Sequence, residues 1–199
     1  MRVVVLVSGG GTNLQALLDA RGDLGAEVVA VISNKPEAYA LQRARGAGVA
    51  CEVLSHKGFA DRAAFDAALR DRVRSYGADL VVLAGFMRVL TPTFLDAFPD
   101  RVVNVHPSLL PSFPGVDAQA QALAYGVKVT GCTVHFVDAG TDTGPIIAQA
   151  AVPVRDDDTV ESLRARVLVE EHRLLPAVVR DLAAGRVRRE GRRVTRAEG

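Results

Sequence analysis

The chain has 199 residues, of which 49% are apolar and 24% are charged, and its formal net charge is +1. These values are typical of a globular protein with one domain over 1–199. The near-neutral charge argues against nucleic acid as a partner, and no apolar run approaches the roughly 18 residues that span a membrane. Cys51 and Cys132 lie within apolar patterns, which predicts buried free thiols in a reducing compartment and a cytoplasmic location.

The first 105 residues alternate between short apolar runs and helical patterns. Continuous β-branched runs are typical of strands buried on both faces. Their alternation with helices indicates right-handed crossovers and a parallel sheet. Strands are predicted at 3–7, 27–33, 49–54, 80–84 and 102–105, and helices at 14–20, 37–46, 61–76 and from Pro92 to about Phe98.

The pattern changes after residue 115. The connection 138–145 between two predicted strands is too short for a parallel crossover, so these strands are expected to pair antiparallel. We therefore predict a single-domain, Rossmann-like α/β fold whose sheet is parallel in the N-terminal half and mixed in the C-terminal half. The pattern predicts a helix at 117–124, strands at 131–137 and 146–154, and a long helix at 157–185. The tail at 187–194 is expected to be an edge strand or a ragged end.

A glycine loop, Ser8-Gly-Gly-Gly-Thr-Asn13, joins the first predicted strand to the first helix. Glycines let the backbone approach a phosphate closely, and the free N–H groups of a helix N-terminus bind anions. The alternative is a tight turn in which Thr12 or Asn13 caps the helix. No Gly-Lys-Ser/Thr follows, and the third glycine of a dinucleotide fingerprint is missing. The loop therefore predicts an anion-binding site that is neither a Walker-type P-loop nor a complete dinucleotide-binding loop.

Polar side chains and three prolines stand together in residues 102–114. Alternation along the strand places Asn104 and His106 on the same face, and Pro107 ends the strand, where ligands bind in open α/β sheets. Asp142 is either a turn former or a carboxylate that stabilises the imidazolium of His106. An amide and a protonated histidine aimed at one oxygen are suited to stabilising an oxyanion during acyl transfer.

Glu171 and the remaining histidines are the other polar side chains that could serve a site. Glu171 falls within the apolar stripe of the long helix, where a carboxylate needs a partner. It is either an ion-paired structural residue or a ligand for a polar substrate. His135, in the middle of a predicted strand, is interpreted as structural, and His56 and His172 as surface residues. No Cys/His ligand spacing is present, so we expect no metal.

Five segments match one family in order along nearly the whole chain: Ser8–Gln15, Ala84–Leu90, Asn104–Pro111, Gly131–His135 and Asp142–Ile146. On these residues the chain resembles the phosphoribosylglycinamide formyltransferases, folate-dependent enzymes of purine biosynthesis. Some members carry histidines where this chain has Asp117 and Gln119.

The resemblance implies that 10-formyltetrahydrofolate gives its formyl group to the amine of 5-phosphoribosylglycinamide. It implies a phosphate-binding half at about 1–100 and a folate-binding and catalytic half at about 101–199, in a monomer or homodimer with only small-molecule substrates. It also suggests a cis peptide at Leu110–Pro111. The implied catalytic residues are Asn104, His106 and Asp142; those for phosphate and glycinamide are Gly11, Thr12, Asn13 and Glu171; and those for folate are Arg62, Met87, Arg88, Val89, Leu90, Asp138, Ala139, Gly140 and Thr141.

Two other functions stay open at this point. A 10-formyltetrahydrofolate hydrolase would keep Asn104, His106 and Asp142 but use water as the acceptor. A non-catalytic module that binds a phosphate or a nucleotide would need the glycine loop but not these three side chains together.

Overall fold

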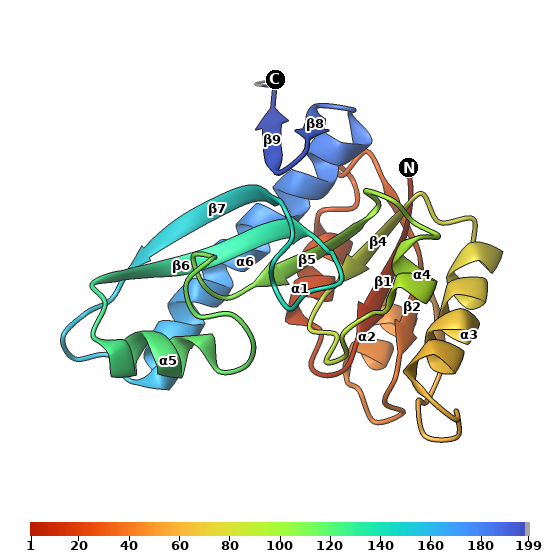
Figure 1. The fold of residues 1–199 in the computed structure, drawn as a ribbon, viewed down its shortest axis with the longest axis horizontal. Coiled ribbons are helices and arrows are strands. Elements are labelled where there is room, and N and C mark those ends of the chain that lie inside the picture. The colour runs from red at the N-terminus through yellow and green to blue at the C-terminus, as the bar shows by residue number, and fades with distance from the viewer. Residues whose placement is uncertain (198–199) are drawn as a thin grey trace.

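The computed structural model describes residues 1–197 as a seven-stranded sheet covered by helices, with a two-stranded hairpin near the C-terminus (Figure 1). In chain order the elements are β1 (Arg2–Val7), α1 (Thr12–Asp19), β2 (Glu27–Ser33), α2 (Ala40–Gly46), β3 (Ala50–Val53), α3 (Arg62–Ser75), β4 (Leu80–Leu83), α4 (Pro92–Leu95), β5 (Val102–His106), α5 (Ala118–Tyr125), β6 (Val129–Phe136), β7 (Ile146–Pro153), α6 (Val160–Ala183), β8 (Val187–Glu190) and β9 (Arg193–Arg196).

The strand order of the large sheet is β3-β2-β1-β4-β5-β6-β7. The pairs from β3 to β5 are parallel, whereas β5 with β6 and β6 with β7 are antiparallel. The predicted α/β fold with a mixed C-terminal half is therefore confirmed. The chain reverses its direction of travel across the sheet between β1 and β4, and in such folds ligands bind beyond the carboxyl ends of the strands at this point.

Strand β1 lies at the centre of the core and is buried on both faces. Val3, Val5 and Val7 pack in one apolar cluster with α1 and the second half of α6. Val4 and Leu6 pack in another cluster, with α3 and α4. This explains why the strand has no polar alternation, because each face is covered by helices. Each buried aliphatic side chain contributes about 1.5–3 kcal/mol to the stability of this arrangement.

Helix α6 is the longest element and crosses the face of β6 and β7 (Figure 1). The side chain of Thr159 accepts a hydrogen bond from the Ser162 amide, and the Ser162 hydroxyl accepts one from the Thr159 amide. This reciprocal cap starts the helix three residues later than the sequence pattern suggests. The helix ends before Gly185, which has a left-handed φ of 68° and can adopt it without a Cβ clash.

Three expectations are wrong in detail. Neither Thr12 nor Asn13 caps α1, because Gly11 holds the cap position with φ 72° and no side chain makes the cap bond. The tail is a hairpin of its own, β8 with β9, rather than an edge strand of the large sheet. Cys51 is free, as expected, but only half-buried, since β3 is the outermost strand, whereas Cys132 is free and buried.

Leu110–Pro111 is a cis peptide, as the resemblance suggested. Among residues 1–197, no helix has the length and apolar character needed to cross a bilayer.

Gly11 joins the glycine loop to α2 through close packing. A Cβ at this position would lie 2.5 Å from Ala40 Cβ and 2.8 Å from Ala40 Cα. We expect Gly11→Ala to lower the free energy of unfolding by about 1–3 kcal/mol, from the positive φ and the overpacking together. Urea denaturation measures the change.

Gly10→Ala is the matched control, because a Cβ there meets no atom within 4 Å. Equal stability of the two variants would show that the contact with Ala40 does not constrain the loop.

Candidate active site

Four polar side chains share one face of the antiparallel half of the sheet. Asn104 and His106 point to the same side of β5, and the register pairs Asn104 with His135 of β6 and His106 with Thr133. Directly opposed residues in an antiparallel pair have neighbouring side chains. The strand pairing therefore brings His135 beside Asn104, although 31 positions separate them in the sequence.

Asp142 reaches this face from the loop between β6 and β7, which lies in front of β5 in Figure 1. Its Oδ2 is 3.2 Å from His106 Nδ1 and accepts a hydrogen bond of 2.8 Å from the Gly115 amide. Its Oδ1 accepts a longer bond of 3.4 Å from Asn104 Nδ2. The fold thus brings Asn104, His106 and Asp142 into one hydrogen-bonded cluster.

His106 is only 4% exposed, and acceptor oxygens face both of its ring nitrogens. Nδ1 faces the Asp142 carboxylate, and Nε2 donates to the Phe113 carbonyl oxygen at 2.8 Å. A carbonyl and a carboxylate can only accept, so this pattern fits a ring that carries a proton on each nitrogen. The cluster therefore places a carboxylate against one ring nitrogen of His106 and a backbone carbonyl against the other.

The Asp142 carboxyl is the electrostatic centre of the cluster. Burial alone would raise its pKa, but the neighbouring His135 ring, the hydrogen bond from the Gly115 amide and the charge of His106 together outweigh burial. The net result is a pKa below the usual range of an aspartate. Asp142 is consequently ionised at neutral pH and able to compensate a positive charge on His106.

His135 is the member of the cluster that the sequence interpretation missed. It is 2% exposed, and its Nδ1 donates to the carbonyl oxygen of Phe136 at 2.8 Å. Nε2 then faces the Asn104 amide at 3.3 Å and Asp142 Oδ1 at 3.7 Å. A neutral ring accepts from the amide, and a protonated ring donates to the carboxylate. Either way His135 helps to orient Asn104, and only the β5–β6 register reveals this.

The segment after β5 is held in place by side chains of β6 and β7. Thr133 Oγ1 donates to the Ser108 carbonyl at 2.7 Å and accepts from the Leu110 amide at 3.1 Å. Gln149 Nε2 donates to the Leu110 carbonyl at 2.9 Å and to Thr133 Oγ1 at 3.0 Å. Ser108 in turn donates to the Ser112 carbonyl. These bonds fix the path of the loop that covers His106.

The glycine loop and α6 form a second group of candidate residues. Asn13 Nδ2 donates to Glu171 Oε2 at 2.6 Å, while Asn13 Oδ1 is buried and has no protein partner. Glu171 is 6% exposed, in agreement with its place in the apolar stripe. Burial raises the pKa of Glu171, and the bond from Asn13 only partly opposes this. A buried carboxylate with a single protein donor is available to a ligand that brings more donors.

The loops after β1, β2 and β4 are tied together by Ser8. Its amide donates to the Gly85 carbonyl, its hydroxyl donates to Asn34 Oδ1 at 2.6 Å, and the Met87 amide donates to the Ser8 hydroxyl at 2.8 Å. Met87 is 67% exposed. These bonds fix the Met87–Leu90 loop at the carboxyl end of β4, beside the end of β1.

The other residues implied in folate binding surround the cluster, and most of them are at least partly exposed. Arg62 is exposed in the first turn of α3, and Arg88 stacks over Phe65 of the same helix, with 4.9 Å between its guanidinium carbon and the ring centroid. Val89 is partly exposed and Leu90 is buried. In the β6–β7 loop, Asp138 accepts bonds from the Gly140 amide and the Thr143 hydroxyl, and the exposed positions are Ala139, Gly140 and Thr141.

No group of three or more His, Cys, Asp or Glu side chains within residues 1–197 is arranged to hold a metal ion.

Comparisons with known proteins identify similar formyltransferases. Residues 1–179 match the family model described as formyl transferase. The phosphoribosylglycinamide formyltransferase of Mycobacterium tuberculosis is 50% identical over 98% of this chain and 93% of its own length. A crystal structure of glycinamide ribonucleotide transformylase 1 from Symbiobacterium toebii has a TM-score of 0.98 and 56% identity, covering 100% of this chain and 94% of that one.

A longer relative is also similar. The trifunctional purine biosynthetic protein adenosine-3 of Drosophila melanogaster is 52% identical over 92% of this chain. The chain spans only 14% of the length of that protein.

The raised pKa of Glu171 predicts a pH-dependent effect on stability. A carboxyl whose pKa is higher in the folded than in the unfolded state destabilises the fold once pH exceeds its unfolded value of about 4.3. We expect Glu171→Gln, which keeps an acceptor for Asn13, to be more stable than wild type at pH 7.5. The gain should shrink as pH falls toward 4.5, as measured by urea denaturation.

Glu170→Gln removes one charge at the neighbouring position and serves as the control. A Glu171→Gln variant that is less stable at pH 7.5 would show that the ionised side chain stabilises the fold.

Proposed function

The chain belongs to the formyl transferase family of enzymes, and on this basis we propose that it transfers the formyl group of 10-formyltetrahydrofolate to the amine of 5-phosphoribosylglycinamide. The products are formyl-phosphoribosylglycinamide and tetrahydrofolate. The observation that carries the proposal is the cluster in which Asp142 contacts both His106 and Asn104. No nucleophilic side chain is needed, because the acceptor substrate brings its own amine.

The reaction is a direct acyl transfer. The lone pair of the substrate amine attacks the formyl carbon, a new C–N bond forms, and the carbonyl electrons move onto oxygen. Collapse of this intermediate breaks the bond to N10 of the folate, and the proton lost by the attacking amine is balanced by one gained at N10. The oxyanion is the high-energy species of this reaction, and preorganised hydrogen-bond donors stabilise it most effectively.

Asn104 and His106 supply these donors. The bond from Asn104 Nδ2 to Asp142 is long at 3.4 Å, so its N–H can be redirected to a stronger acceptor. His106 Nε2 donates to the Phe113 carbonyl, and the oxyanion would replace that carbonyl as the acceptor. Asp142 keeps His106 protonated and can pass a proton through water to the leaving nitrogen.

The two substrates would approach from different loops. The free N–H groups at Gly11, Thr12 and Asn13 are suited to binding the substrate phosphate. The Glu171 carboxylate is suited to accepting hydrogen bonds from the ribose or glycinamide part of the same substrate. The Met87–Leu90 loop with Arg62 and the 138–141 loop would bind the folate. The division into a phosphate half at about 1–100 and a folate half at about 101–199 belongs to this proposal, as do a cytoplasmic location and a monomeric or homodimeric state.

A formyl-transfer assay tests the proposal against its rivals. Tetrahydrofolate should form from 10-formyltetrahydrofolate only when phosphoribosylglycinamide is present, in equal amount with the formylated product. Equal rates with and without the amine would identify a hydrolase. Binding of the phosphate substrate without any turnover would identify a non-catalytic module.

His106→Ala removes both the oxyanion donor and the proton source. We expect kcat to fall by on the order of 100-fold or more, with little change in the KM of either substrate. Steady-state kinetics give both values, and the unfolding midpoint shows whether the fold is intact. A folded variant with the wild-type rate would remove His106 from the mechanism.

Asp142→Asn takes away the charge that faces His106 Nδ1. The imidazolium then loses its counter-ion, so we expect the alkaline limb of the kcat–pH profile to move to lower pH. The acidic limb should not respond to Asp142 above about pH 4, because its pKa is already below the usual range.

Asp156→Asn is the control, because Asp156 pairs only with Lys128 at the surface. Superimposable profiles for Asp142→Asn and wild type would leave Asp142 as a turn former.

A further inference from the structure

A groove of about 660 Å³ lies between α1 and α6, away from the His106 cluster. Its lining includes Thr12, Gln15 and Asp19 of α1, Arg43 of α2, and His172 and Arg180 of α6. The two helices run in parallel, because Asn13 contacts Glu171 at one end and Arg180 donates to the Asp23 carbonyl at the other.

An arginine lies toward each end of the groove, and each guanidinium hydrogen-bonds to neutral groups. Arg43 Nε donates to the Gly10 carbonyl at 2.8 Å, and its Nη1 donates to Gln15 Oε1 at 3.1 Å. Arg180 Nε donates to the Asp23 carbonyl at 2.9 Å. Within residues 1–197 neither guanidinium forms an ion pair. Both are therefore held in place by neutral groups and keep N–H donors for an anion.

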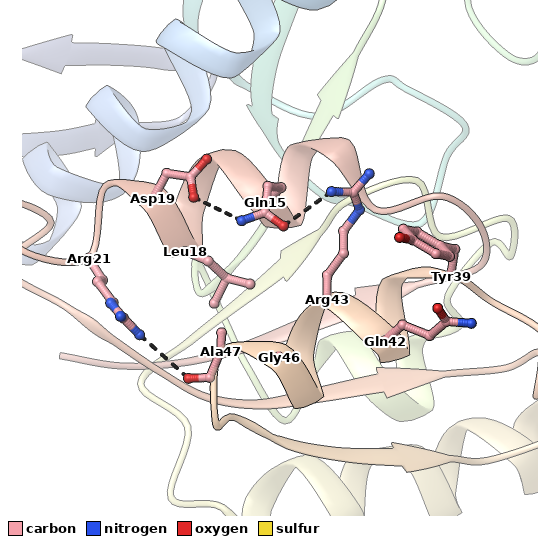
Figure 2. Close-up of a pocket in the computed structure, with 9 residues that line it drawn as sticks. All are labelled: Gln15, Leu18, Asp19, Arg21, Tyr39, Gln42, Arg43, Gly46 and Ala47. Atoms are coloured by element: carbon pink, nitrogen blue, oxygen red, sulfur yellow. Dashed lines mark hydrogen bonds between the residues drawn. The ribbon is translucent and has the colours of Figure 1, made fainter.

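Figure 2 draws the neighbouring pocket between α1 and α2, which shares Gln15, Asp19 and Arg43 with the groove. Arg43 reaches Gln15, and Gln15 Nε2 donates to Asp19 Oδ1 at 2.8 Å. The Arg43 guanidinium also lies over the Tyr39 ring, 5.0 Å from its centroid. Contacts on three sides limit the rotamers of Arg43, so little conformational entropy is lost when it binds a ligand.

His172 adds a polar atom without a partner. Its Nε2 is buried and makes no hydrogen bond within the protein. Burial lowers the pKa of His172, and the nearby charge of Arg43 lowers it further. A neutral imidazole here has an unused hydrogen-bonding nitrogen, which a ligand in the groove could engage.

We propose that the α1–α6 groove is a second anion-binding site, which takes a small molecule with a phosphate group at each end, such as a sugar bisphosphate. From Thr12 to Ala20 on α1, and from His172 to Arg180 on α6, eight residues span about 12 Å. Arg43 contacts Gly10 and Gln15 near the start of α1, and Arg180 contacts Asp23 beyond its end, so the two guanidiniums serve opposite ends of the groove and favour a ligand with two phosphates. Gln15 and Asp19 offer groups for sugar hydroxyls, and the Asp19 carboxylate would repel an uninterrupted polyphosphate chain.

The site is distinct from the substrate phosphate loop, although the two adjoin. Thr12 belongs to both, and Arg43 contacts the loop through the Gly10 carbonyl. Arg180, however, contacts Asp23 and lies two helical turns away from that loop. A loss of binding caused by Arg180 therefore reports on the groove and not on the substrate phosphate.

Calorimetric titration of the unmodified chain tests the proposal without turnover. Fructose 1,6-bisphosphate should bind at least tenfold more tightly than fructose 6-phosphate at low ionic strength. Arg180→Met should weaken the bisphosphate about tenfold, the scale of one charge-assisted hydrogen bond. Arg180→Lys should restore most of the affinity.

Arg164→Met is the matched control, because Arg164 is an exposed arginine on the first half of the same helix, outside the groove. Three results would each overturn the proposal: equal affinity for the two sugar phosphates, an unchanged affinity in Arg180→Met, or an equal loss in Arg164→Met. Because no formyl transfer is measured, the outcome is independent of the function proposed above.

Discussion

The Asp142 carboxylate is the constraint around which the candidate active site is built. A half-buried charge must be met by donors or by an opposite charge, and here the Gly115 amide, His106 and Asn104 meet it. Two loops that are separate in sequence therefore fold together over β5. Asp142 itself has a left-handed φ of 55°, a conformation that costs a non-glycine residue on the order of 1 kcal/mol. The surrounding contacts hold the residue in this conformation, which aims its carboxylate at His106.

The two halves of the mixed sheet contribute different features to the proposed site. The parallel half provides a glycine loop followed by a helix, where backbone N–H groups are free for a phosphate. The antiparallel half provides direct cross-strand neighbours, which is how Asn104 and His135 come to lie side by side. In a wholly parallel sheet the strand beside β5 would not run antiparallel to it, and this direct opposition of Asn104 and His135 would be lost. The change of strand direction therefore helps to bring these two side chains together.

Much of the fold was predictable from the sequence, because burial leaves a recognisable pattern of apolar residues along the chain. Continuous apolar runs marked the strands, the short 138–145 connection marked the antiparallel pair, and the helical stripe placed Glu171 in the core. His135 was missed because its role depends on strand register, which a sequence does not show. The hairpin was missed for a similar reason. Asp181 of α6 binds both Arg186 and Arg196, and these ion pairs form only after the chain has turned back.

The central claim, that Asp142 holds His106 as an imidazolium, can be tested directly by ¹⁵N NMR of the histidine side chains at pH 6. The account predicts that both ring nitrogens of His106 resonate as protonated nitrogens in the wild-type protein. In Asp142→Asn one of them should shift toward the unprotonated range. A wild-type His106 with one unprotonated nitrogen at this pH, or a spectrum that Asp142→Asn leaves unchanged, would contradict the account.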